Sequence, residues 1–457
     1  MIGRIDLASI MPEILLLFGT TGLLLVRPPR RAAGILSLTT VVLSFWATLP
    51  QWIGTRALFG GTYVTGPFPA AFKAAALLGT AVAIVIVFLD KRLQEHIPEA
   101  NALILFTACG ALLLISARNF LLAYLAFEML SVSSYALVGS RPGEIKSAEA
   151  GLKYAVFGGA ASAFLLYGIS LLYGMTGTLQ YGLVGPVLSS GAGIVAVLFV
   201  FVGVMYKLAA APFHYWSPDA FEGAAPSIAG YLSVVPKIAG FAFLIFLLDF
   251  LGDSRAFLAL LTASAFLSMT YGNLAAIAQK NVPRLLAYSS IAHAGYILVA
   301  AGTLGTSGRF AVFFYLAAYL FMNLGAFLVT TVVAPTGAIS EFRALSRRNA
   351  FLAFAMAVFL FSLTGLPPFG GFVGKLFILS AAIDRGAWFL IAALVVNTVI
   401  SLYYYARILK EMYLEDGDET PFPASATARF CVGALTAGVF LLGIAWSPVA
   451  ALLQRIT

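Results

Sequence analysis

The chain has 457 residues, of which 61% are hydrophobic and 10% are charged, and its formal net charge is +8. A soluble domain has about 45–50% apolar and about 25% charged residues, so this composition excludes an ordinary soluble protein. The basic residues stand singly or in short groups between apolar runs, which argues against a nucleic-acid partner. Because the apolar runs are about 20 residues long, enough to cross about 30 Å of hydrocarbon as helices, we predict an all-α membrane protein.

Fourteen hydrophobic segments follow one another along the chain, and each is predicted to be a transmembrane helix. They begin near Ala8, Ala33, Ala70, Ala100, Phe120, Leu152, Gly191, Pro226, Ala256, Leu285, Phe310, Ala350, Ala387 and Phe430. The seventh and twelfth segments are unusually long and contain prolines. Because proline lacks the N–H that a helix interior requires, we predict that these two helices are broken at Pro212 and Pro368.

The order of the segments indicates an inverted repeat within a single polytopic domain that spans residues 1–457. Residues 134–138 (SYALV) in the fifth segment resemble residues 295–299 (GYILV) in the tenth, and a proline-interrupted segment follows each. An odd number of helices separates the copies, which therefore have opposite orientations, and inverted repeats with broken helices are typical of transporters. The predicted parts are helices one to three (1–99), a repeat of helices four to eight (100–250), a repeat of helices nine to thirteen (256–411) and a C-terminal helix (428–457).

The placement of Lys and Arg sets the expected topology, because cytoplasmic loops are enriched in them. With the amino terminus outside, fifteen of these basic residues fall in inside loops, namely Arg27, Arg30, Arg31, Lys91, Arg92, Arg141, Lys146, Lys280, Arg284, Arg343, Arg347, Arg348, Arg407, Lys410 and Arg429. Eight fall outside, namely Arg4, Arg56, Lys73, Arg118, Arg255, Arg309, Arg385 and Arg455. We therefore expect a multi-pass protein of a bacterial plasma membrane with both termini in the periplasm.

Charged residues inside the predicted helices are the candidate functional residues. The loop count leaves out Lys153, Lys207, Lys237 and Lys375. Glu128 lies near the middle of the fifth helix, and the last three lysines lie in the seventh, eighth and twelfth helices. A charge at a helix centre costs roughly 2.5–3.5 kcal/mol on insertion, so these residues require an explanation beyond composition.

Two interpretations of these charges remain open. In a structural scaffold, Glu128 and Lys207 would form a buried ion pair that only fixes helix packing. That interpretation leaves Lys237 and Lys375 without acidic partners at their depth. Because desolvation disfavours the ammonium form of a lone buried lysine, such a residue can exchange a proton near neutral pH. We favour this second interpretation, a proton relay of one glutamate and three lysines.

Further polar groups lie close to the relay in sequence. Pro212 and Pro368 leave the carbonyl groups of Leu208 and Thr364 without a helical donor, so water or polar groups must satisfy them inside the membrane. His293 lies mid-helix near Ser289, Ser290 and Tyr296, and its unperturbed pKa of about 6.5 suits proton passage. A hydrogen-bonded core histidine is the alternative.

Three more residues complete the candidate set. His214 follows the first break and is the weaker histidine candidate, at a channel mouth. Glu149 and Lys153 are four residues apart, which is typical of an interfacial helix pair that could also tune Glu128. For a metal or cofactor, neither the cysteines Cys109 and Cys431 nor the three histidines have ligand spacing, and no P-loop or dinucleotide fingerprint occurs.

Several sequence runs resemble the antiporter-like, proton-translocating subunits of respiratory complex I. They are residues 127–135 (FEMLSVSSY), 148–154 (AEAGLKY), 206–219 (YKLAAAPFHYWSPD), 281–296 (NVPRLLAYSSIAHAGY), 321–326 (FMNLGA) and 365–375 (GLPPFGGFVGK). Within that family the sequence is most similar to the subunit N branch of NADH–quinone oxidoreductase. The similarity to that branch rests on residues 11–14 (MPEI), on a lysine at Lys375, and on the lack of a long lateral helix after the last segment.

The resemblance implies a fold and a role for each candidate. The family has fourteen helices, inverted repeats of helices four to eight and nine to thirteen, and broken helices seven and twelve. Glu128 resembles the acid that tunes Lys207, Lys237 resembles the central connecting lysine, and Lys375 resembles the lysine of the second half-channel. His293 resembles a linking residue.

The resemblance also implies proton translocation driven by quinone reduction elsewhere in the complex. The chain would act in catalysis only as a subunit of an NADH:quinone oxidoreductase and would hold no cofactor, with flavin, iron–sulfur clusters and quinone in other subunits. Its expected partners are other membrane subunits, including related antiporter-like ones, and membrane lipid. The alternative is a subunit of a multisubunit sodium/proton antiporter, which shares the glutamate, the lysines and the broken helices.

Overall fold

The computed structural model describes residues 4–141, 143–183, 190–251 and 254–454, so Arg455 of the outer set lies outside the described residues. The chain forms two compact units. Among the described residues, unit 1 contains those up to Ala209 and Val235–Leu260, and unit 2 contains Ala210–Val234 and the residues from Leu261 onwards. Each unit is described by itself below.

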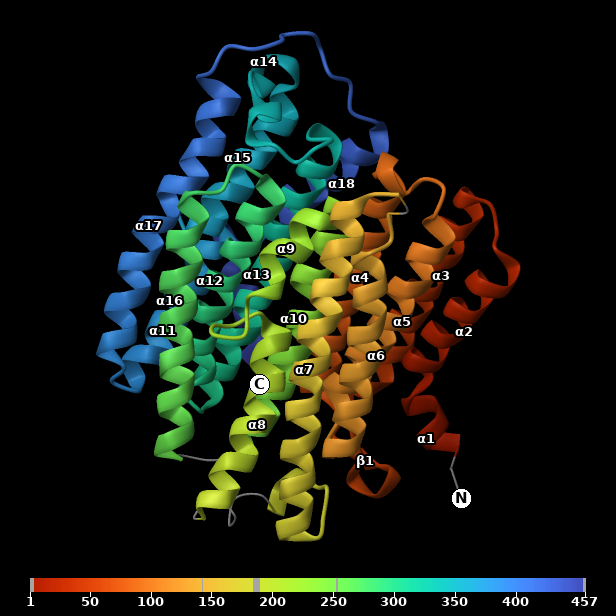
Figure 1. The fold of residues 1–457 in the computed structure, drawn as a ribbon, viewed down its shortest axis with the longest axis vertical. Helices are drawn as coiled ribbons and strands as arrows, with labels where there is room; N and C mark the ends of the chain where they lie inside the picture. Colours follow the sequence, from red (N-terminus) through yellow and green to blue (C-terminus); the bar gives the residue numbers. More distant parts are fainter. Residues whose placement is uncertain (1–3, 142, 184–189, 252–253, 455–457) are drawn as a thin grey trace. The chain divides into compact units, whose positions relative to one another are not determined.

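The helices of unit 1 are α1 (Arg4–Ser9), α2 (Met11–Val26), α3 (Arg30–Thr48), α4 (Pro67–Leu89), α5 (Ile97–Ser116), α6 (Phe120–Val138), α7 (Ile145–Thr176), α8 (Gly191–Leu208) and the second part of α10 (Pro226–Leu251). Consecutive helices from α1 to α8 pack against one another, and α2 also packs against α5 (Figure 1). Between α3 and α4 the chain forms an antiparallel hairpin of β1 (Arg56–Leu58) and β2 (Tyr63–Thr65). Several helices begin where their sequence favours it, with Pro67 and Pro226 opening α4 and α10 and the side chain of Asn119 capping α6.

Unit 2 begins with α9 (Trp216–Gly223) and the first part of α10. Its further helices are most of α11 (Arg255–Ile277), then α12 (Val282–Ala301), α13 (Thr306–Val333), α14 (Leu345–Arg348), α15 (Ala350–Thr364), α16 (Gly370–Asp384), α17 (Trp388–Tyr413), α18 (Ala426–Ile444) and α19 (Trp446–Gln454). Within this unit α13 packs against α12, α15, α16 and α18. Its side chains are accordingly buried along almost its whole length.

Length and hydropathy identify the membrane-spanning helices. Among the described residues, eleven helices are long and apolar enough to cross a membrane, and α2 and α15 are shorter apolar helices. Large apolar side chains also cover their outer faces, for example Leu152 on α7 and Val399 on α17, each 66% exposed. Such faces mark contact with a membrane or with another protein, and together with the spanning helices they indicate an all-α membrane protein, as predicted.

Two helices are interrupted where the sequence predicts it. The helix α8 ends at Leu208, Ala209 adopts a left-handed conformation, and helical structure resumes at Trp216. The helix α15 ends at Thr364 in the same way, with Gly365 at φ +90°, and α16 begins at Gly370. In both breaks a Pro-Phe pair begins three residues after the left-handed residue, and the bonds preceding Pro212 and Pro368 are cis. In contrast, α10 continues through Pro236.

Candidate functional site

Glu128 and Lys207 line one cavity in unit 1, as the sequence leads us to expect. Glu128 projects from the middle of α6, and Lys207 lies in the last turn of α8. The cavity between them has a volume of about 10 Å³, which is close to the least that can hold one water molecule. The lysine is 2% exposed, whereas the glutamate is only half-buried.

The two charges are held by separate hydroxyl groups. The Lys207 Nζ donates to the Ser131 Oγ at 3.1 Å, and the carboxylate of Glu128 accepts a hydrogen bond from Ser162 of α7. Ser131 lies three residues after Glu128, so both groups face the cavity from neighbouring turns of α6. The arrangement is therefore a hydroxyl-lined gap and not a direct ion pair, and a water molecule in it would connect the two residues.

Lys375 occupies a second buried site, in unit 2. It lies in the second turn of α16, is 4% exposed, and donates to the carbonyl oxygen of Thr364 at 2.8 Å and to the Thr398 Oγ1 at 3.1 Å. Its Nζ also lies 4.4 Å from the centre of the Tyr296 ring. The carbonyl that Pro368 leaves without a helical donor thus receives its hydrogen bond from the lysine itself.

Gly365 is required for this close approach. A Cβ atom at this residue would lie 2.8 Å from the Cδ of Lys375, and its φ of +90° is one that residues with side chains rarely adopt. The glycine therefore serves both the left-handed turn that ends α15 and the access of the lysine to the freed carbonyl.

Lys207 and Lys375 both lie close to the C-terminal end of a half-helix, although Lys207 precedes its break and Lys375 follows its break. Lys207 precedes its break and lies at the C-terminal end of α8, while Lys375 follows its break and binds the C-terminal carbonyl of α15. Helix C-termini carry partial negative charge that stabilises a cation, and broken half-helices use such ends to coordinate ions in transporters. Each interruption therefore creates a position for a buried ammonium group.

His293 lies at the centre of a buried polar cluster in unit 2. It is 2% exposed, its Nδ1 lies 2.7 Å from the Tyr315 hydroxyl, and its Nε2 lies 3.5 Å from the Tyr405 hydroxyl. Tyr405 also bonds to Ser289, and Tyr319 donates to Ser290 at 2.9 Å. The two serines that lie near His293 in the sequence are thus bonded to tyrosines.

A second set of polar side chains extends from Tyr296. Its hydroxyl accepts from the Asn273 Nδ2 at 2.9 Å, and Tyr404 donates to the Asn273 Oδ1 at 2.9 Å. Asn273 also bonds to Asn397 at 3.2 Å. Since the rings of Tyr404 and Tyr405 are 4.4 Å apart, this set bridges the surroundings of Lys375 and His293. An amide exchanges protons poorly, so we assign Asn273 a positioning role.

The remaining predicted residues lie outside these two polar sets. Lys237 is 2% exposed and lies in the part of α10 that belongs to unit 1. His214 is buried within the first break, where it stacks on Tyr215 with ring centres 4.5 Å apart, and neither of its nitrogens has a hydrogen-bond partner among the described residues. Glu149 and Lys153 form an exposed i,i+4 ion pair at 2.6 Å, of the kind that contributes little to stability.

One buried charged network was missed by the sequence reasoning. The Lys73 Nζ, 0% exposed on α4, lies 2.8 Å from the Glu13 Oε1 of α2 and also donates to Gln51 at 3.2 Å and to the Tyr63 hydroxyl at 2.6 Å. Tyr63 in turn donates to Glu13 at 2.7 Å, and Gln51 donates to the backbone of Ser9 at 2.8 Å. The network joins the hairpin to the N-terminal helices of unit 1.

The charge count concealed this network because it assigned Lys73 to an outer loop. The lysine lies seven residues into α4, between Phe72 and a run of alanines. Its apolar neighbours on both sides were the available signal. An acidic partner stabilises a buried lysine, and Glu13 is the acid in the first apolar segment.

We expect Lys73→Met to destabilise the protein strongly. The change leaves the Glu13 carboxylate buried without its ammonium partner, and breaking a buried ion pair in this way costs about 3–5 kcal/mol. Adding Glu13→Leu removes the orphaned charge and restores most of the stability. The measurement is the thermal unfolding and yield of the purified assembly.

The exposed pair of unit 1 provides a matched control for this prediction. Lys153→Met removes a lysine from an ion pair of similar length on α7, where the expected change is about 1 kcal/mol or less. Equal stability of the Lys73 and Lys153 variants would contradict the structural role of the buried network.

Among the described residues, a metal ion would be held by the chain's own His, Cys, Asp and Glu side chains. No group of three or more His, Cys, Asp or Glu side chains lies close enough to hold a metal ion in that part of the chain. The hydrogen-bond partners of Lys207 and Lys375 are instead hydroxyl and carbonyl groups.

Comparisons with known proteins agree on one family. Residues 117–401 match the family described as "NADH:quinone oxidoreductase/Mrp antiporter, TM". The NADH-quinone oxidoreductase subunit N 2 of Sorangium cellulosum is 39% identical, with 97% of this chain and 96% of the relative covered. A subunit N from Trichlorobacter lovleyi is 37% identical over 99% of this chain and 97% of its own length.

Two solved structures are similar to this chain in fold, and one of them is also similar in sequence. A chain of respiratory complex I from Thermus thermophilus with bound aureothin has a TM-score of 0.85 at 33% identity, covering 96% of this chain and 98% of that one. A chain of the Mrp complex from Dietzia sp. has a TM-score of 0.89 at only 20% identity, covering 99% of this chain and 97% of that one, and indicates the fold alone. The chain therefore belongs to the antiporter-like membrane subunits of NADH-quinone oxidoreductase, respiratory complex I, in the subunit N branch.

Proposed function

We propose that this subunit translocates protons through two half-channels, centred on Lys207 and Lys375, when quinone reduction elsewhere in complex I drives the movement. Glu128 controls the charge of Lys207 in the first half-channel. Lys237 and His293 connect the halves, and Tyr296 orients Lys375 in the second. The observation that carries the proposal is the placement of a buried ammonium group at the C-terminal end of the first half of each broken helix, by its own position for Lys207 and by a hydrogen bond for Lys375.

We propose that the chain has the fourteen transmembrane helices that the sequence predicts. The eleven long apolar helices are joined by α2, α12 and the α15–α16 pair. Helices four to eight then correspond to α5 through α10, and helices nine to thirteen to α11 through α17. The left-handed residue and the Pro-Phe pair at the same spacing in both breaks support an internal repeat. We further propose a bacterial inner membrane with both termini in the periplasm.

The cofactors and partners follow from this assignment. Flavin, iron–sulfur clusters and quinone belong to other subunits, so this chain converts no substrate by itself. Its partners are further membrane subunits of the complex, including related antiporter-like ones, together with lipid. His214 and the Glu149–Lys153 pair have supporting roles at the edges of the first half-channel.

The test uses the purified complex in sealed liposomes with NADH and a quinone, and measures proton and sodium fluxes separately. We expect proton translocation that persists without sodium, and a Lys237→Met variant that assembles but pumps less. Sodium-dependent transport would favour the antiporter alternative. Unchanged pumping by Lys237→Met, with normal assembly, would remove Lys237 from the path.

A further inference from the structure

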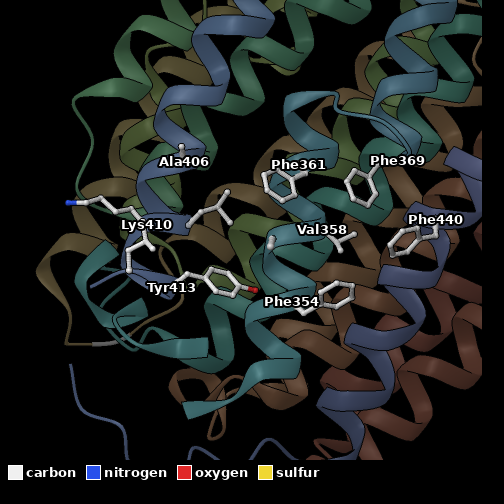
Figure 2. Close-up of a pocket in the computed structure, with 11 residues that line it drawn as sticks. Phe354, Val358, Phe361, Phe369, Ala406, Lys410, Tyr413 and Phe440 are labelled. Carbon is white, nitrogen blue, oxygen red and sulfur yellow. The ribbon is translucent and has the colours of Figure 1, made fainter. Parts of the chain in front are cut away.

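An apolar groove lies on unit 2, between α17 and α18 and over α15. Its volume is about 520 Å³, and Figure 2 shows the aromatic rings that form much of its wall. Phe354, Phe361 and Phe369 form the floor and the end next to the second break, and Phe440 closes one side. The α17 wall consists mainly of apolar side chains, and Lys410 stands where that helix approaches its end. The groove opens on helices that span the membrane, so its natural contents are hydrocarbon.

The volume of the groove distinguishes between two apolar occupants. A helix about 10 Å in diameter fills about 420 Å³ in each 5.4 Å turn, so the groove holds little more than one turn. A lipid acyl chain spans one leaflet of about 15 Å and, at a width of about 5 Å, fills about 300 Å³. The groove therefore has room for one acyl chain, whereas a whole transmembrane helix could not enter it.

The charges beside the groove favour one class of headgroup. Lys410 forms an ion pair with Glu415 at 2.6 Å, and Arg343 nearby is paired with Glu411 at 2.7 Å. The Lys410 side chain is 63% exposed and extends away from the rings in Figure 2, so its pair is weak and opens at little cost. A site with one cation and one anion suits a phosphate joined to an ammonium better than it suits a net negative charge.

We propose that this groove binds one acyl chain of a zwitterionic phospholipid, whose phosphate contacts Lys410 and whose amine contacts Glu415. Tyr413, 43% exposed, lies at the level of the headgroup, where tyrosines are enriched in membrane proteins. The far end of the chain meets Phe361 and Phe369, whose stacked rings flank the second break with centres 6.4 Å apart. The lipid thus forms the outer wall of the helix break that contains the partner carbonyl of Lys375.

The test fills the groove from one side and leaves the rest of the helix unchanged. Ala406→Trp places a large ring inside the groove, whereas Ala392→Trp adds the same ring to an exposed position of α17 outside it. The probe is phosphatidylethanolamine with a photoreactive diazirine near the end of one acyl chain, added to the assembled complex in liposomes. A phosphatidylglycerol with the same chain is the comparison. Ala357→Phe fills the groove from α15 if the first variant does not assemble.

We expect the phosphatidylethanolamine probe to label residues 354–369 in the parent and in Ala392→Trp, and this labelling to be lost in Ala406→Trp or Ala357→Phe. Phosphatidylglycerol should label the segment more weakly. Labelling that survives both groove-filling variants, or an unlabelled segment in the parent, would overturn the site. Equal labelling by the two lipids would overturn the headgroup assignment. The outcome does not depend on whether the subunit moves protons or sodium, because it reports lipid contact alone.

Discussion

Lys375→Ala is expected to lower proton translocation and coupled turnover of the complex by about tenfold or more, which corresponds to about 1.4 kcal/mol in a rate-limiting step. The variant removes the ammonium that binds the carbonyl of Thr364 and the hydroxyl of Thr398. Assembly should persist, because the smaller side chain leaves space for water that can satisfy the carbonyl. Proton flux and NADH oxidation are measured on the same preparation.

Lys375→Arg tests whether the residue carries protons or only charge. Arginine keeps a positive charge at this place but hardly deprotonates in proteins, so we expect poor rescue of pumping. The guanidinium group must also fit beside Gly365, where an added Cβ atom would lie 2.8 Å from the lysine Cδ. Lys280→Arg, at an exposed position between α11 and α12, is the matched control and should pump at the parent rate. Full pumping by Lys375→Arg would mean that Lys375 is a fixed charge.

The second large effect is expected for Glu128 and Lys207 in combination. Glu128→Gln and Lys207→Met should each reduce pumping, and Lys207→Met should also leave the carboxylate facing a cavity without its positive neighbour. Because Glu128 is half-buried and bonded to Ser162, the loss of stability in either variant should be smaller than the several kcal/mol of a fully buried pair. Thermal stability, assembly and proton flux are measured for both variants and for the double variant.

The double variant separates a structural pair from a relay. It contains no unpaired charge, so we expect its stability to return to that of the parent under either interpretation. A relay requires a titrating group in the cavity, so pumping should remain low. Pumping at the parent rate by the double variant would falsify the relay. Ser131→Ala, which removes only the hydroxyl that Lys207 binds, should keep pumping partly intact.

The sequence was sufficient to predict the breaks and the buried lysines of the two halves. Pro212 and Pro368 remove backbone hydrogen bonds wherever they occur in a helix, and a lysine such as Lys207 is costly in an apolar run, so both are local signals. The family resemblance gave the same residues. Pro368 lies in a break, whereas Pro236 lies within the continuous helix α10. A proline in an apolar segment therefore does not by itself predict a break.

The partners of these residues could not be predicted, because they depend on packing between distant segments. Thr364 is eleven residues from Lys375, and Thr398 comes from another helix altogether. Glu13 and Lys73 are sixty residues apart, and neither lies in a motif that names the other. The gap between Glu128 and Lys207 likewise results from the register of α6 against α8, which no one-dimensional pattern contains.

The hydrogen bond between Lys375 and the Thr364 carbonyl links the proton on one residue to the shape of the backbone. By thermodynamic reciprocity, whatever separates the two half-helices must act on the proton, and loss of the proton must act on the half-helices with the same coupling free energy. A small displacement of α15 relative to α16 then changes the free energy of protonation of Lys375, so the break couples backbone movement to proton binding. In the proposed relay, a conformational change transmitted from a neighbouring subunit would need to move only this break to release a proton from Lys375.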